Sequence, residues 1–169
     1  MSSKALLLSL LHYKAWADRE LIAGFLSLLD GAPDDACGMA LKVLEHAHIV
    51  DCIFVENLQG RTHGYTRTES DEVPDPGRLF AGIEQLDVWY IDFVSQLSDP
   101  QLVESIPFVF TDGKRGRMSR EEMLAHIVSH AGYHRGEVGR VLTQITGSSP
   151  RDTFTGFLHE REPERATSN

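Results

Sequence analysis

Four long segments of this chain carry apolar side chains at alternating spacings of three and four residues, and this periodicity limits the possible folds most. Such spacing places the apolar side chains on one face of an α-helix, and that face must be buried against another element. The predicted helices span about residues 4–29, 34–58, 77–97 and 119–146. Four amphipathic helices around one core predict an all-α four-helix bundle.

Turn and capping residues separate these segments. Asp30-Gly31-Ala32-Pro33 is expected to end the first helix, and Ser119-Arg120-Glu121-Glu122 is a capping box that starts the last one. Between the third and last helices, IPFVF at 106–110 followed by TDGKRGRM predicts a short strand, a turn and a partner strand. The tail, residues 150–169, contains one apolar group and is expected to fray at its charged end.

Length, charge and cysteine content narrow the class of protein. A chain of 169 residues predicts a single domain over residues 1–169. Lys and Arg total 16 against 25 Asp and Glu, a net charge of −9 that disfavours nucleic-acid partners. No stretch reads as a signal peptide or a membrane span, and Cys37 and Cys52 lie too far apart on one helix to form a disulfide. We therefore expect a cytoplasmic protein.

Three histidines recur at every fourth position of the last helix, at His126, His130 and His134. Side chains at i and i+4 are neighbours and can bind one metal ion, but residues i and i+8 lie about 12 Å apart along the axis. All three therefore cannot share an ion. A helical projection places His134 within the apolar stripe, His130 at its border and His126 outside it, which favours the pair His130 and His134.

The second helix offers a third imidazole. The projection turns His46 toward the core and His48 away from it, so His46 could complete the set from a facing helix. Three neutral nitrogen ligands with one open position are typical of a catalytic metal site, with zinc favoured and nickel, copper or iron also compatible. The alternative is that these histidines are hydrogen-bonded core residues that bind no metal. No HExxH sequence is present, so nothing indicates a metalloprotease.

Together these motifs resemble the DinB/YfiT-like family of helical-bundle metal proteins. The resemblance rests on Tyr13-Lys14-Ala15-Trp16, on Leu44-Glu45-His46 followed by Asp51, and above all on the HxxxHxxxHRG signature from His126 to Gly136. In this family a histidine of the second helix and the last two of the signature bind a divalent metal. The resemblance therefore implies His46, His130 and His134 as metal ligands.

The resemblance also bears on the chemistry. Relatives include thiol-dependent transferases and isomerases that use low-molecular-weight thiols, which implies a metal-dependent enzyme that activates a thiol and acts on a small molecule. A hydrolase that uses metal-bound water, or a non-catalytic metal-binding module of the stress response, is the alternative. The catalytic residues are not identified by the sequence.

Several other features carry weaker expectations. The polar loop over residues 60–76, with His63 and Tyr65, could close over a site, although a surface loop is the simpler interpretation. Arg135 is expected to form a structural ion pair rather than to bind a substrate. The basic cluster before the last helix is read as a solvated turn; it comprises Lys114, Arg115, Arg117 and Arg120.

Two further sets of residues concern packing around the histidines. Three carboxylates could orient a ligand imidazole, namely Asp51, Asp87 and Asp92. Three glycines share one face of the last helix, opposite the histidines: Gly132, Gly136 and Gly139. Each glycine costs about 1 kcal/mol relative to alanine in a helix, so we expect another helix to pack closely there, within the chain or across a homodimer.

Overall fold

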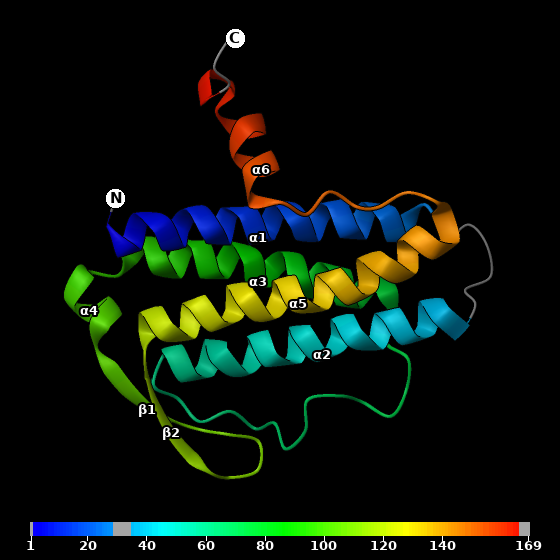
Figure 1. Ribbon diagram of the computed structural model, residues 1–169. Coiled ribbons are helices and arrows are strands. Elements are labelled where there is room, and N and C mark those ends of the chain that lie inside the picture. Colours follow the sequence, from blue (N-terminus) through cyan, green and yellow to red (C-terminus); the bar gives the residue numbers. More distant parts are fainter. Residues whose placement is uncertain (1, 29–34, 166–169) are drawn as a thin grey trace.

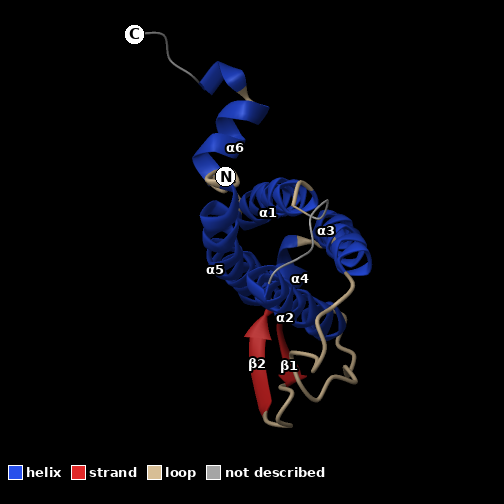
Figure 2. Cartoon of the chain, turned by 90° about the vertical axis from the view of Figure 1, so that its right-hand side faces the viewer, coloured by secondary structure: helices blue, strands red, loops and turns tan. Residues whose placement is uncertain are grey.

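The computed structural model describes residues 2–28 and 35–165 of the chain. Its four long helices are α1 (Ser3–Leu26), α2 (Asp35–Leu58), α3 (Pro76–Gln96) and α5 (Arg120–Thr146), which run side by side (Figure 1). Seen end-on, they surround one core, with α1 between α3 and α5 and with α2 on the opposite side (Figure 2). The all-α four-helix bundle predicted from the apolar spacing is confirmed.

A short helix and a hairpin connect α3 to α5. They consist of α4 (Asp99–Val103), β1 (Ser105–Val109) and β2 (Arg115–Ser119), and the antiparallel register pairs Ser105 with Ser119 and Val109 with Arg115. Ile106 and Phe108 are buried, whereas the turn projects past the bundle beside the loop that follows α2 (Figure 1). The predicted hairpin is confirmed, and it covers one end of α2.

Both ends of α5 follow the predicted capping chemistry. The Ser119 hydroxyl accepts a hydrogen bond from the Glu122 amide at 3.2 Å, and the Glu122 carboxylate accepts one from the Ser119 amide at 2.7 Å. Gly147 ends the helix in the left-handed region, with φ of 75°, a conformation that glycine adopts without steric cost. These caps explain why α5 is the longest helix although three glycines lie within it.

The link between α1 and α2 and the C-terminal tail are the two segments where the structure does not simply match the sequence-based expectations. The expected stop at 30–33, and residues 29 and 34 of the predicted helices, lie outside the described residues. The tail was expected to contain one apolar group and to fray at its charged end; it forms a helix, α6 (Phe154–Arg161), followed by a 3-10 turn, η1 (Pro163–Arg165), and residues 166–169 lie outside the described residues. The Thr153 side chain caps α6, and Phe157 is buried against Trp16 of α1, which stabilises a helix that otherwise stands away from the bundle (Figure 1).

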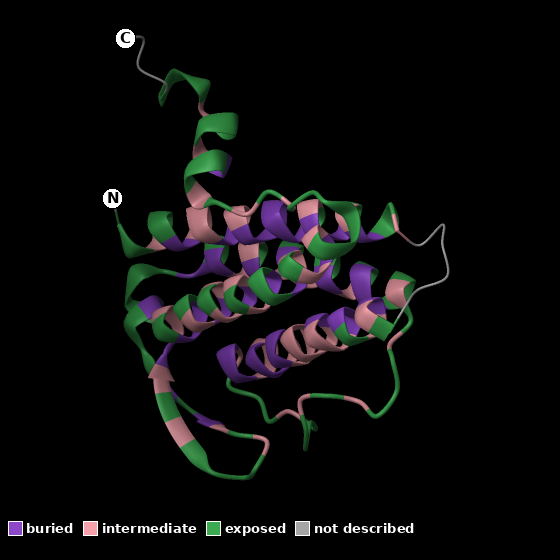
Figure 3. Cartoon of the chain, turned by 45° about the vertical axis from the view of Figure 1, so that its right-hand side comes forward, coloured by how far each residue is buried: buried purple, intermediate pink, exposed green. Residues whose placement is uncertain are grey.

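Buried residues line the inner faces of the four long helices (Figure 3). Three apolar residues whose spacing predicts a core-facing position are instead exposed: Leu6 by 42%, Met39 by 63% and Ile145 by 39%. All three lie toward helix ends, and near Met39 the core-facing positions of α2 are taken by Cys37, Ala40 and Leu41. Periodicity alone therefore identified the correct helices but extended their buried stripes too far toward the ends.

Within residues 2–28 and 35–165, no helix covers the glycine face of α5, so that part of the packing prediction is wrong for the described residues. Gly136 is exposed, and a β-carbon built on it would meet nothing within 4 Å. A β-carbon on Gly139 would lie 3.9 Å from Pro150, in the segment that leads to α6. The face borders an open cleft of about 520 Å³. A homodimer through this face stays a prediction.

Within residues 2–28 and 35–165, no helix combines the length and the apolar character needed to cross a bilayer. The cytoplasmic location expected from the sequence stays a prediction.

Candidate metal centre

The three histidines predicted as ligands lie together where α2 faces α5. His130 and His134 are one turn apart on α5, and their Nε2 atoms are 3.2 Å from each other. The His46 ring, on α2, lies 5.3 Å from the His130 ring and 4.8 Å from the His134 ring, measured between centroids. One nitrogen from each imidazole falls within 4.8 Å of the other two. The set could therefore hold one metal ion.

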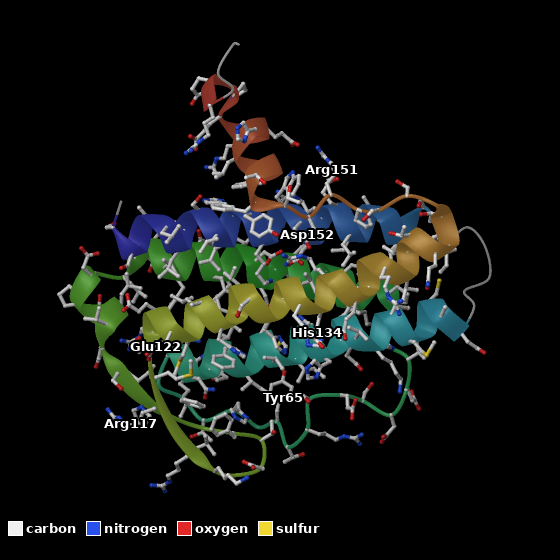
Figure 4. The ribbon with its side chains drawn as sticks, in the orientation of Figure 1. Tyr65, Arg117, Glu122, His134, Arg151 and Asp152 are labelled. Carbon is white, nitrogen blue, oxygen red and sulfur yellow. The ribbon has the colours of Figure 1, made fainter. Side chains whose placement is uncertain are left out.

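Hydrogen bonds to the outer ring nitrogens orient two of these imidazoles. His46 Nδ1 lies 3.1 Å from the carbonyl oxygen of Thr68, in the loop after α2. His134, which is labelled in Figure 4, has its Nδ1 2.8 Å from a carboxylate oxygen of Glu137, one turn further along α5. Because a carbonyl and a carboxylate only accept, each Nδ1 must carry the proton, which leaves Nε2 with a lone pair facing the cluster. Such outer contacts are typical of metal-binding histidines.

His130 contacts His134 through Nε2 and has no hydrogen-bond partner at its outer nitrogen among the described residues. This outer nitrogen, Nδ1, is buried. Burial, assisted by the neighbouring His134, His126 and His46, lowers the pKa of His130 to about 4. The ring is then neutral near pH 7, as a nitrogen ligand must be. A cation between Nε2 of His130 and Nε2 of His134 would use both lone pairs.

The two competing histidines are placed elsewhere. His126 stacks on the Phe54 and His130 rings, at 4.9 Å and 5.2 Å between centroids, and does not join the three-histidine cluster. His48 was expected to point away from the core, but it is half-buried between α2 and α3, where a β-carbon on Gly82 would lie 2.9 Å from its ring. Its Nε2 is 3.8 Å from the Cys52 sulfur. Because Gly82 has no side chain, the His48 ring has room to pack against α3. A helical projection of α2 alone could not show this contact.

A pocket of about 280 Å³ adjoins the cluster, with His46 and His130 in its wall. Its other walls come from α2, from the hairpin and from Thr68. His63 and Tyr65, the loop residues that could close over a site, do not line this pocket. His63 Nε2 lies 2.7 Å from the Val109 carbonyl oxygen, and Tyr65 is exposed by 39%. The loop nevertheless contributes the Thr68 carbonyl that orients His46.

A second polar cluster occupies the centre of the bundle, and it contains two of the three carboxylates expected to orient a ligand. Lys14 Nζ lies 3.0 Å from Asp18, 3.0 Å from Asp51 and 2.7 Å from Asp87. Burial alone lowers the pKa of Lys14, but the three carboxylates raise it well above its ordinary value. Asp51 and Asp87 therefore balance a buried ammonium rather than orient an imidazole, and the third carboxylate, Asp92, is exposed.

Arg135 extends this cluster, as its structural interpretation predicted. Its guanidinium lies 3.1 Å from Asp18 and 2.9 Å from Asp152, whose position is labelled in Figure 4. In the basic cluster before α5, Lys114, Arg115 and Arg117 are exposed, as the interpretation as a solvated turn predicted. Arg120 differs, because it is partly buried and donates to the carbonyl oxygens of Leu58 and Gln101.

Sequence reasoning missed four contributors to these two clusters. Lys14 entered the sequence analysis only within the Tyr13-Lys14-Ala15-Trp16 motif and Asp18 not at all, although their i, i+4 spacing is a usable signal of an ion pair. Glu137 also had a signal, because it follows His134 by three residues on the same helix. The Thr68 carbonyl had none, since a backbone group in an irregular loop has no sequence signature.

Comparisons with known proteins agree with this arrangement. The chain is 21% identical over 174 residues to the protein named Protein DinB of Bacillus subtilis (strain 168), and the match covers 93% of this chain and 96% of that protein. No solved structure matches the chain. The DinB family model matches residues 1–165, a range that includes all four long helices and the histidine cluster. With that coverage, the chain belongs to the DinB family.

Proposed function

We propose that this DinB-family chain is a metal-dependent enzyme that acts on a small molecule, with a divalent ion held by His46, His130 and His134. The proposal is carried by the convergence of three imidazole nitrogens from α2 and α5. It is supported by the contacts of Thr68 and Glu137 with the outer nitrogens, because these contacts leave each Nε2 free to bind.

An ion bound by three neutral nitrogens keeps an open position, with zinc favoured and nickel second, and would stabilise a thiolate or acidify a water molecule. We favour thiol activation, hence an S-transferase-like reaction with a low-molecular-weight thiol. Among the described residues, no carboxylate lines the pocket beside the cluster, and His126, which is not among the proposed ligands, is the side chain of its wall that could serve a hydrolase as general base. Hydrolysis is the second candidate.

The pocket also supports catalysis over a non-catalytic metal-binding role. A purely structural metal site has a complete ligand shell and needs no adjoining space. Here His46 and His130 both face a volume of about 280 Å³. A small molecule bound in this volume would lie against two of the three proposed ligands.

Elemental analysis of untagged protein, after reconstitution with zinc and separately with nickel, tests the metal site. We expect one equivalent of metal in the wild type and less than a tenth of an equivalent in His46→Ala, His130→Ala and His134→Ala. His48→Ala and His126→Ala should retain the metal. His159→Ala, an exposed histidine on α6, is the matched control.

A wild type that stays metal-free after both reconstitutions would overturn the proposed site. If metal binds as expected, the zinc-loaded and metal-free proteins are compared in an assay that follows thiol consumption by a panel of small electrophiles. Consumption that depends on the metal and is lost in His130→Ala supports S-transfer. Metal-dependent ester cleavage without thiol would support the hydrolase instead.

A further inference from the structure

The pocket beside the histidine cluster has a chemical character that narrows what it can bind. It lies between the C-terminal half of α2, the hairpin and the N-terminal half of α5, and its remaining wall is Thr68. At about 280 Å³ it is near the lower end of the range for small-molecule sites. Its occupant is therefore a small molecule or one group of a larger molecule.

Most of the wall is apolar. The side chains that give it this character are Val50, Ile53, Phe54, Phe108, Phe110 and Met118. Within the described part of the chain, no Lys, Arg, Asp or Glu lines the pocket. Moving an ionic group from water into such surroundings without a partner is costly, so an anionic or cationic ligand is disfavoured.

Besides three histidines and two threonines, one buried amide interrupts the apolar wall. Asn57, in the last turn of α2, is only 2% exposed and lines the pocket. Its Nδ2 meets no hydrogen-bond partner among the described residues. A buried donor left unmet costs about 1–3 kcal/mol, so a ligand atom that accepts a hydrogen bond here gains more than it would on an exposed surface.

We propose that this pocket binds a small, uncharged, apolar molecule that carries a carbonyl-type acceptor, and that Asn57 is the residue that selects for the acceptor. The role of this molecule as a substrate rests on the proposed function, whereas its binding does not. The apolar body lies between α2 and the hairpin, and the acceptor accepts a hydrogen bond from Asn57 Nδ2. The end that faces His46 and His130 is the end exposed to the metal.

Three probes of nearly equal shape separate these contributions. Acetophenone has an apolar ring and a carbonyl, α-methylstyrene replaces the carbonyl oxygen with a methylene, and benzoate adds a negative charge. Ligand-observed NMR titration is carried out on protein freed of metal by chelation, so that a carbonyl cannot bind an ion instead. We expect acetophenone to bind about tenfold more tightly than α-methylstyrene, and benzoate more weakly than either.

Substitutions then locate the binding. Asn57→Leu should remove the preference for the ketone by weakening acetophenone binding about tenfold while preserving binding of α-methylstyrene. Gln96→Leu, which replaces an exposed amide on α3 with the same side chain, is the matched control and should change neither affinity. Thr111→Phe, a second variant in the pocket wall, should weaken binding of both neutral probes by occupying the pocket. Circular dichroism and urea unfolding verify that each variant is folded.

The outcomes for the pocket and for the metal site can be told apart. Equal affinity for the ketone and the alkene, or no saturable binding of either, would overturn the pocket assignment even if elemental analysis finds metal. Conversely, a ketone preference that depends on Asn57 sustains the assignment even if the protein binds no metal, in which case the proposed function fails alone. Tighter binding of benzoate would also overturn it.

Discussion

The bundle contains two clusters of polar side chains, and they differ in the charges that they bring together. Around Lys14, groups of opposite charge meet, and the residues come from all four long helices, with Arg135 joining from α5. One oxygen of Asp51 and one of Asp87 have no hydrogen-bond partner among the described residues. Around His130, like groups converge instead: three imidazoles meet, with Nε2 of His130 and Nε2 of His134 3.2 Å apart. Burial of polar groups therefore does not by itself indicate a site, whereas the convergence of potential metal ligands beside a pocket does.

The largest effect is expected from removing the cation of the Lys14 cluster. Lys14→Met leaves Asp18, Asp51 and Asp87 without their shared partner, and breaking a buried ion pair in this way costs about 3–5 kcal/mol. Urea unfolding at pH 7 measures the loss. Lys114→Met, at an exposed hairpin position, is the control and should leave the midpoint of urea unfolding nearly unchanged. Equal losses in the two variants would show that the cluster is not structural.

A smaller change in folding stability is expected when the pH is varied. Burial, only partly offset by Lys14, raises the pKa of Asp87 to about 7. Its pKa in the unfolded chain is about 4, so between these values the unfolded state releases a proton that the folded state keeps. The contribution of Asp87 to stability is thus complete at low pH and is lost as the pH rises toward 7.

Asp87→Asn keeps this position neutral at every pH. The variant should gain stability relative to the wild type as the pH rises from 4 to 8, by up to about 4 kcal/mol, which corresponds to a pKa difference of about three units. Unfolding by urea at a series of pH values measures both profiles. Asp92→Asn, an exposed aspartate on the same helix, should follow the wild type. Parallel profiles for Asp87→Asn and wild type would contradict the assigned cause.

In the histidine cluster the expected change is in metal affinity rather than in stability. Glu137→Gln weakens the contact that orients His134, and loss of such an outer partner lowers metal affinity about tenfold. Competition with a chromophoric chelator measures zinc affinity, while urea unfolding of the metal-free protein should change little. Glu84→Gln, an exposed glutamate on α3, is the control. An unchanged affinity would remove Glu137 from the centre.

The smallest effect distinguishes two glycines that lie outside both clusters. Gly136→Ala should stabilise the protein by about 0.5–1 kcal/mol, because nothing opposes the added methyl group and alanine favours the helix. Gly82→Ala gains the same propensity but would force the His48 ring to move, since the new β-carbon would lie 2.9 Å from it. Thermal unfolding compares the two. A destabilised Gly136→Ala would instead indicate that a second copy covers this face.

The sequence allowed much of the centre to be predicted. Spacing on α5 and α2 selected His46, His130 and His134, and the structure brings these three together. The sequence could not place His48, because the burial of a residue on the outer side of a helix depends on the element packed against it, here α3 with Gly82. Nor could the sequence identify Thr68 or Asn57. Thr68 contacts His46 through its backbone carbonyl, and the Nδ2 atom of Asn57 has no hydrogen-bond partner among the described residues. Neither property has a sequence signature.

The sequence by itself determined the four helices, the hairpin, the caps of α5 and the pairing of His130 with His134, because each depends on residues within one or two helical turns of one another. Only the tertiary structure decided that Lys14 gathers carboxylates from three helices and that an apolar pocket lies beside the histidines. Those features depend on contacts between residues far apart in the chain. Local spacing carries no information about such contacts, since they are fixed only when the helices pack.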